Sequence, residues 1–258
     1  MYNDSDTAAI DANLDLDTLK HQRKVEKSFV FFLIFLIIIF KGWFSFWFKY
    51  GIAIPNGKAN SINITQDPIQ INYSPEEKKQ KTFVHNSFIN KNKITIIPQA
   101  HYELSGTAVA FNRSFLFTYN FFDSAALYDL GTAWGKMGDK NFYKKHYKSY
   151  SQKNEVTGSR ILWTQAKDYP PALPMEYSTS HYSHSHLVPA NRNVMAALLK
   201  IRRWDRIKIT GDLIDMQFKG QKYNTSMSRN DHDLGDRGNG SCETIYGKSV
   251  QIGKKVYK

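Results

Sequence analysis

The chain has 258 residues, enough for one folded domain together with a tail, a membrane anchor and a linker. Hydrophobic residues make up 41% and charged residues 22%, so the chain contains enough apolar side chains for a packed core. The formal net charge is +12, but the basic residues are scattered and follow no nucleic-acid-binding motif. Nucleic acid is therefore not an expected partner. The single cysteine, Cys242, excludes an internal disulfide framework and a cysteine-based zinc finger.

An apolar segment near the N-terminus predicts a transmembrane helix over residues 28–48. Twelve consecutive apolar side chains run from Phe29 to Phe40, and aromatic residues continue the segment beyond Lys41. Together they reach the roughly 20 residues that a membrane-spanning helix needs. Bulky side chains occupy the positions where a signal peptidase would require small ones, which predicts an anchor that is retained rather than cleaved.

The charges around this segment predict its orientation. Four cations precede it, namely Lys20, Arg23, Lys24 and Lys27. By the positive-inside rule they favour a cytoplasmic tail over residues 1–27. We therefore expect a single-pass protein of the bacterial inner membrane, with its C-terminal domain periplasmic or extracellular. Residues 49–93 are rich in Pro, Asn, Lys and Gln and predict a linker.

Residues 94–258 predict an exported α+β domain with mostly antiparallel strands. The small and apolar residues over 124–135 predict a compact turn or a short helix, with close backbone approach at Gly131 and Gly135. Runs of β-branched, aromatic or alternating apolar residues predict strands at 94–97, 102–109, 114–119 and 161–163.

The second half of this domain predicts a short helix followed by a strand. Apolar residues at helical spacing predict the helix near 193–201, with Asn191 or Asn193 as its N-cap. Alternating apolar and polar residues over 206–216 predict a half-buried strand that bends or bulges at Gly211.

Four stretches of this region carry a resemblance to other proteins: Asp129 to Gly135 (DLGTAWG), His184 to Asn191 (HSHLVPAN), Asp205 to Ile214 (DRIKITGDLI), and Ser226 to Asp231 continuing through Gly240 to Glu243. Over about residues 100–250 the chain resembles an uncharacterised family of bacterial single-pass membrane proteins. The resemblance implies the anchored layout with an exported domain, and it implies no particular activity.

Cys242 is a candidate catalytic nucleophile. It lies in the segment Gly-Asn-Gly-Ser-Cys-Glu, whose glycines offer backbone N–H groups as an oxyanion hole if folding brings a histidine near the thiol. His186 is the candidate base, and Glu243 or Asp129 is the candidate for orienting it. The alternative is a small buried cysteine beside a turn that needs glycine for its backbone conformation.

The histidines at 181, 184 and 186 are candidate metal ligands. His184 and His186 are alternate residues, which could share a metal ion if the segment is extended. No carboxylate-bearing metal signature accompanies His181, His184 and His186, and the intervening Ser and Tyr residues are typical of a polar loop. The alternative is a hydrogen-bonded structural histidine at His186. No cofactor is predicted.

Without a complete catalytic signature, the sequence favours a non-catalytic envelope protein. Its exported domain would bind another protein, for instance within a secretion-type membrane complex. Two alternatives stay open, an envelope hydrolase using Cys242 and His186 and a metal-binding domain at the histidine cluster. Whether the chain is an enzyme is not decided by these patterns.

Overall fold

A computed structural model of the chain describes residues 28, 30–39, 51–88, 92–113, 126, 128–146, 150–154, 161–165, 172–227 and 242–258. The chain divides into two compact units, Met1–Gly51 and Ile52–Lys258. In the first unit, Ser28 and residues 30–39 are helical and carry mostly exposed apolar side chains. The rest of the expected anchor, residues 29 and 40–48, lies outside the described residues. No helix within the described ranges is long and apolar enough to cross a membrane.

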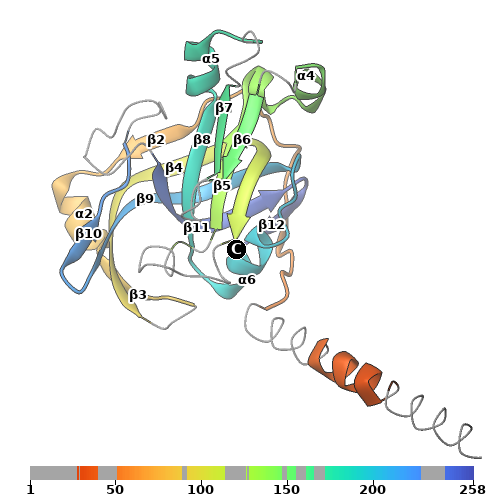
Figure 1. The fold of residues 1–258 in the computed structure, drawn as a ribbon. Helices are drawn as coiled ribbons and strands as arrows, with labels where there is room; N and C mark the ends of the chain where they lie inside the picture. Colours follow the sequence, from red (N-terminus) through yellow and green to blue (C-terminus); the bar gives the residue numbers. More distant parts are fainter. Residues whose placement is uncertain are drawn as a thin grey trace, which may run out of the picture. The chain divides into compact units, whose positions relative to one another are not determined.

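The second unit is an α+β domain with a mixed, mostly antiparallel sheet and a few short helices, as the sequence predicted (Figure 1). Its elements in chain order are β1 (Gly57–Lys58), β2 (Ile69–Asn72), α2 (Pro75–Lys81), β3 (Phe83–Asn86), β4 (Lys93–Arg113), β5 (Tyr128–Ala133), the 3-10 helix η2 (Gly135–Gly138), α4 (Lys140–Lys145), β6 (Tyr150–Asn154), β7 (Ile161–Gln165), α5 (Met175–Ser180), β8 (Tyr182–Pro189), α6 (Arg192–Leu198), β9 (Arg206–Phe218), β10 (Gln221–Tyr223), β11 (Glu243–Ile252) and β12 (Lys255–Tyr257).

Five of the described strands close into a barrel. Around the ring, β4 pairs with β5, β5 with β8, β8 with β11, β11 with β9, and β9 with β4. The β8–β11 pairing is parallel and the other four are antiparallel. Around the ring the strands are β4, β5, β8, β11 and β9, which are the first, second, third, fifth and fourth barrel strands along the chain. Helix α6 connects β8 to β9, the third barrel strand to the fourth. This five-stranded Greek-key barrel has the architecture of the OB-fold.

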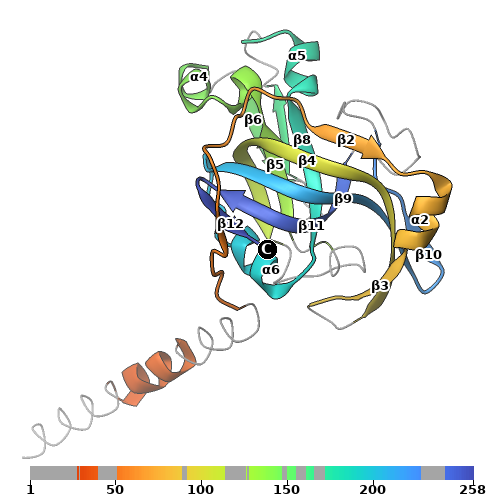
Figure 2. The same ribbon diagram turned by 180° about the vertical axis from the view of Figure 1, so that it is seen from behind.

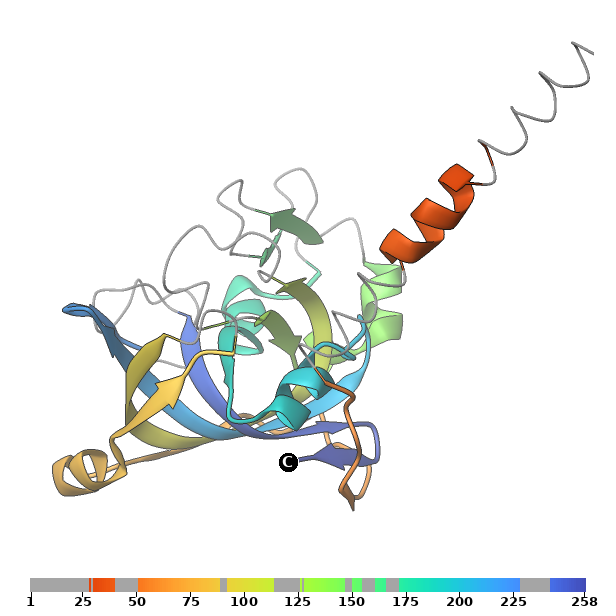
Figure 3. The ribbon, with the colours of Figure 1, turned by 90° about the horizontal axis from the view of Figure 1, so that it is seen from below.

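The barrel interior holds the main hydrophobic core. Each barrel strand contributes a fully buried aliphatic side chain to it: Leu104, Leu130, Leu187, Ile209 and Ile245. Helix α6 adds Val194, Ala197 and Leu198 to the same cluster. Viewed from below, this cyan helix lies across one end of the barrel (Figure 3). Its predicted N-cap is confirmed, because the Asn191 side chain accepts a hydrogen bond from the Val194 N–H at 2.9 Å.

Strand β4 joins two runs that the sequence predicted as separate strands, 94–97 and 102–109. It runs for 21 residues and pairs with β9 along most of its length (Figure 2). Pro98 lacks a backbone N–H, and the pairing with β9 shifts register between Pro98 and Ala100. The proline therefore lies next to an irregularity of the ladder and does not end the strand.

Two local predictions were wrong for a shared reason. Residues 124–135 were expected to form a turn or a short helix, and the segment around His184 was expected to be a polar loop. They contain β5 and β8 instead, and every residue of both strands is buried. A strand that is covered on both faces shows no alternation of apolar and polar residues, so its period cannot be read from the sequence.

The segment expected to be a linker, 49–93, is largely part of the folded unit. From residue 57 onward it contains β1, which pairs with β12, and β2 and β3, which both pair with β4. These strands are only two to four residues long, too short for a period to be read from the sequence, and their apolar side chains Ile69 and Ile71 are exposed. The run expected at 114–119 lies outside the described residues.

Gly211 on β9 allows the barrel to close. It lies opposite Gly247 of β11, and a Cβ atom at Gly211 would overlap the Tyr246 carbonyl oxygen. At Gly247 a Cβ would meet only ordinary van der Waals contacts, the nearest at 3.8 Å from Val194. A side chain is therefore excluded at one glycine of the pair and tolerated at the other.

We expect Gly211→Ala to lower the free energy of unfolding by about 2 to 3 kcal/mol, because the added methyl pushes β9 away from β11. Gly247→Ala is the matched control and should cost less than about 1 kcal/mol. Denaturant unfolding of the two full-length variants in detergent compares them. Equal losses would contradict the assignment of Gly211 as the close contact.

Candidate functional site

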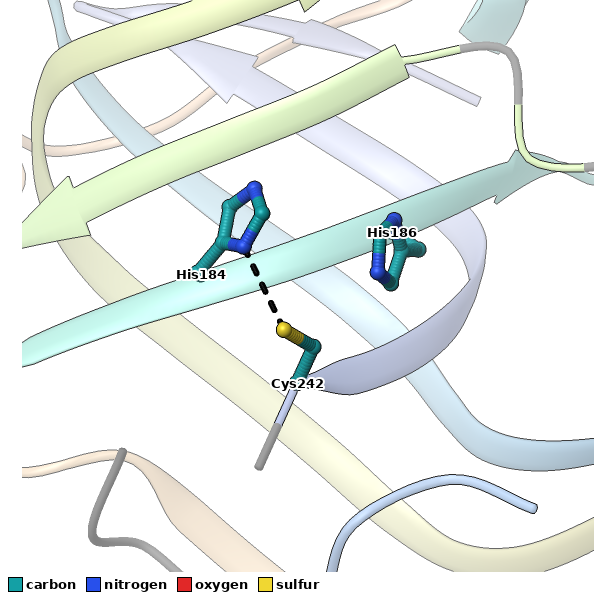
Figure 4. Close-up of side chains that lie close together, drawn as sticks. All are labelled: His184, His186 and Cys242. Atoms are coloured by element: carbon teal, nitrogen blue, oxygen red, sulfur yellow. Dashed lines mark hydrogen bonds between the residues drawn. The ribbon is translucent and has the colours of Figure 1, made fainter. Parts of the chain in front are cut away.

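Three candidate residues from two distant segments of the sequence meet on the outward-facing side of the barrel wall. His184 and His186 are alternate residues of β8 and point to the same side of the strand. In the parallel pairing of β8 with β11, Glu243 lies opposite Ser185, so Cys242 enters β11 beside the two histidines. A ring nitrogen of each histidine and the Cys242 sulfur all lie within 4.8 Å of one another (Figure 4).

The closest contact in this group joins the thiol to His184. Its Nδ1 lies 3.3 Å from Cys242 Sγ, within hydrogen-bonding distance for sulfur. The two imidazole rings are 5.3 Å apart between centroids and tilted by 57°. Both histidines are buried, whereas Cys242 is half-buried. The histidine in direct contact with the thiol is thus His184, while His186 lies beside them.

Asp129 holds the second histidine. It lies directly opposite His186 in the antiparallel pairing of β5 with β8, and its Oδ1 is 2.6 Å from His186 Nδ1. Both side chains are almost fully buried. Because a carboxylate accepts hydrogen bonds, this contact keeps the proton of the neutral imidazole on Nδ1 and its lone pair on Nε2. Of the two carboxylates proposed to orient a histidine, Asp129 is the one in contact with His186.

Glu243 lies on the opposite side of β11 from Cys242, because successive residues of a strand face opposite ways. Its Oε2 accepts a hydrogen bond from Ser183 Oγ at 2.8 Å, and Ser183 Oγ is 2.8 Å from Ser185 Oγ. Burial raises the pKa of Glu243 to about 7, although the hydrogen bond from Ser183 works against this increase. The structure thus places Glu243 among the serines rather than beside a histidine.

His181 does not belong to the group. It follows α5 and stacks on Tyr177 with the ring centroids 3.8 Å apart. Its Nδ1 lies 3.0 Å from the Tyr177 carbonyl oxygen and 3.0 Å from Ser180 Oγ. The three potential ligands that the structure brings together are therefore His184, His186 and Cys242, in place of the predicted set of three histidines.

Gly131 and Tyr182 complete the surroundings of the site. Gly131 lies opposite His184 in the β5–β8 pairing, where the sequence predicted close backbone approach. A Cβ at Gly131 would be 2.7 Å from Tyr182 Oη and 3.0 Å from the Ala110 Cβ. The missing side chain leaves room for the Tyr182 ring next to the histidines. Tyr182 was not singled out from the sequence, where it is one of 15 tyrosines.

The glycines proposed as an oxyanion hole, at 238 and 240, lie outside the described residues. An imidazole in contact with a thiol can accept its proton, and two imidazoles beside a thiolate are a ligand set that zinc prefers.

No protein-family model matches the chain, and neither does any curated protein or solved structure.

Glu243 should make stability depend on pH. Its pKa in the folded protein is about 7, against an ordinary value of 4.5, so the folded state retains a proton that the unfolded chain releases between these values. The contribution to stability is fully present below the ordinary pKa and is lost as pH rises through the folded value.

Glu243→Gln keeps a neutral side chain that can hydrogen-bond to Ser183 and does not titrate. We expect the unfolding free energy of the wild type, relative to Glu243→Gln, to fall by about 1 to 3 kcal/mol between pH 5 and pH 8. Glu76→Gln, at an exposed position of α2, is the control and should give a profile parallel to the wild type. Parallel profiles for Glu243→Gln as well would show that Glu243 has no raised pKa.

Proposed function

We propose that the chain is a thiol-dependent hydrolase that cleaves acyl bonds, with Cys242 as the nucleophile and His184 as its base. The observation that carries this proposal is the 3.3 Å contact between His184 Nδ1 and Cys242 Sγ. A thiol becomes a strong nucleophile only as its thiolate, and a neighbouring imidazole provides the acceptor for the proton.

The reaction follows from this pair. His184 Nδ1 takes the thiol proton, and the Cys242 sulfur attacks the acyl carbon of the substrate. The bond to the leaving group breaks, the leaving group takes the proton from the His184 imidazolium, and the acyl group stays on sulfur as a thioester. Water then attacks the thioester with His184 as base, which releases a carboxylic acid and restores the thiol.

His186 and Asp129 support the pair. The buried Asp129 carboxylate accepts a hydrogen bond from His186 Nδ1 at 2.6 Å and fixes the orientation of that ring beside the thiol. His186 is therefore a positioning residue beside the pair, while the direct contact with sulfur and the proton transfers belong to His184.

The position of the site on the barrel adds support by analogy. Asp129 lies on the second barrel strand, β5, and both histidines lie on the third, β8. In OB-folds the face formed by the second and third strands is the usual ligand-binding surface. The analogy favours a binding role for this face and does not specify the substrate, because one fold can carry many functions. The expected protein partner stays a prediction.

The single cysteine makes a direct test of the nucleophile possible. Iodoacetamide labels only Cys242 in the full-length chain, so the labelling rate reports on this thiol alone. We expect His184→Gln to slow labelling at pH 7 at least about tenfold, because the proton acceptor is lost. His181→Gln is the matched control and should leave the rate within about twofold of the wild type, since its ring contacts Tyr177 instead.

The acyl intermediate provides the second readout of the same prediction. Incubation with a p-nitrophenyl acyl ester should give a burst of nitrophenol and an acyl adduct that mass spectrometry locates on Cys242, and Cys242→Ala should give neither. Labelling of the wild type no faster than that of free cysteine, together with no effect of His184→Gln, would exclude this function.

We also propose that this site works outside the cytoplasm, held by a single transmembrane helix over residues 28–48. The support is the apolar sequence, the helical conformation of residues 30–39 and the cations that precede the segment.

An alkaline phosphatase fused after Lys258 should be active, because that enzyme needs an oxidising compartment, and a green fluorescent protein at the same point should be dark. Deleting residues 28–48 should reverse both results by keeping the domain in the cytoplasm. A bright fluorescent fusion on the intact chain would mean that the C-terminal domain is cytoplasmic.

A further inference from the structure

We infer that the Cys242 sulfur and the two imidazoles of His184 and His186 form a zinc site, and that a bound Zn²⁺ ion holds the thiol inactive. The regulatory half of this inference rests on the proposed nucleophile, whereas the metal site stands on its own geometry. The three potential ligand atoms lie within 4.8 Å of one another.

The donor set fits zinc in kind. Zn²⁺ is bound in proteins mainly by cysteine sulfur and histidine nitrogen, and a set of two histidines and one cysteine combines both. Harder cations such as Ca²⁺ and Mg²⁺ prefer oxygen ligands, and the carboxylate of this group, Asp129, is engaged with His186. The site therefore favours a borderline transition metal over the hard cations.

The distances fit with a small adjustment. Tetrahedral zinc with Zn–S of about 2.3 Å and Zn–N of about 2.0 to 2.1 Å places its ligand atoms roughly 3.3 to 3.6 Å apart. The 3.3 Å between His184 Nδ1 and Cys242 Sγ already falls in that range. All three ligand atoms lie within 4.8 Å of one another, so a separation beyond this range would have to shorten by at most about 1.5 Å as the side chains close around the ion.

Asp129 is the independent observation that points to a metal. Histidines that bind metals typically donate their other ring N–H to a carboxylate, which fixes the tautomer and strengthens the ligand nitrogen. The 2.6 Å contact between His186 Nδ1 and Asp129 Oδ1 has this geometry. With Nδ1 donating to Asp129, His186 would bind the metal through Nε2, whereas His184 would bind through the Nδ1 that already touches the sulfur.

Metal binding and nucleophilic attack compete for the same electron pair. When Zn²⁺ binds, the thiol loses its proton to solvent and the thiolate donates its lone pair to the metal, so affinity rises with pH. The sulfur is then not available to attack an acyl carbon, and the His184 nitrogen that would accept the proton is also bound. Among the described residues three ligands come together, and they leave a fourth coordination position for water or another ligand.

The test uses the full-length chain in detergent, purified with a histidine-free tag, reduced and treated with a chelator. Co²⁺ serves as the spectroscopic probe, and Zn²⁺ affinity is measured by competition with a chromophoric chelator. We expect one Co²⁺ per chain, with visible bands of tetrahedral geometry and a near-ultraviolet charge-transfer band from the thiolate. Saturating Zn²⁺ should slow iodoacetamide labelling of Cys242 at least about tenfold, and the chelator should restore it.

Variants separate this site from surface histidines. Cys242→Ser should lose the charge-transfer band, and Asp129→Asn should weaken Zn²⁺ binding about 10- to 100-fold while keeping that band. His181→Gln is the control and should bind within about twofold of the wild type. Circular dichroism identifies any variant that does not fold, and His186→Gln then replaces it, with an expected loss of affinity at least as large as that of Asp129→Asn.

The outcomes distinguish the two proposals. A reactive thiol that forms an acyl adduct, but gives no thiolate band with Co²⁺, overturns the metal site and leaves the hydrolase. The opposite result is a clear thiolate band with Co²⁺ while the metal-free thiol labels no faster than free cysteine. That result supports the metal site and overturns the hydrolase. Tight Zn²⁺ binding that does not slow labelling overturns the regulatory half.

Discussion

The site depends on the parallel pairing of β8 with β11. This register places Glu243 opposite Ser185, and therefore Cys242 next to His184, although the two residues are 58 positions apart in the chain. A shift of one residue would turn Cys242 toward the barrel interior and Glu243 toward the histidines, because alternate residues face opposite sides. The two rows of polar side chains, one inside the barrel and one outside, are thus defined by one pairing.

That pairing is held by the closure of the barrel. Strand β11 lies between β8 and β9, so its position is fixed from both sides. Its contact with β9 requires the close approach at Gly211, where a side chain would overlap the backbone of Tyr246. Helix α6, which connects β8 to β9, packs against the same core as the barrel strands. The glycine and the helix thus help to determine where Cys242 lies.

The sequence predicted the fold class, the helix near residue 193 and the strand over 206–216, since each of these has a clear period or a cap such as Asn191. It could not predict β5 and β8, because burial on both faces removes the alternation by which strands are recognised. For the site, the sequence identified the reactive residues by type but not their pairing. Asp129 and His186, which the sequence proposed as a pair, are in contact. This contact depends on strand register, as do those of Cys242 with His184 and of Glu243 with Ser183, and no local pattern encodes register.

Burial is the reason that this polar group is a candidate functional site. His184, His186 and Asp129 are each at most 4% exposed, and removing such groups from water costs free energy that their hydrogen bonds only partly offset. Apolar side chains on the same strands would fill this space at lower cost, as Leu130 and Leu187 do one position away on the inner face. The half-buried thiol is the member of the group that a substrate or a metal ion can reach most easily. Two buried imidazoles and a carboxylate gathered beside a thiol therefore make this group the one on which the proposed function rests.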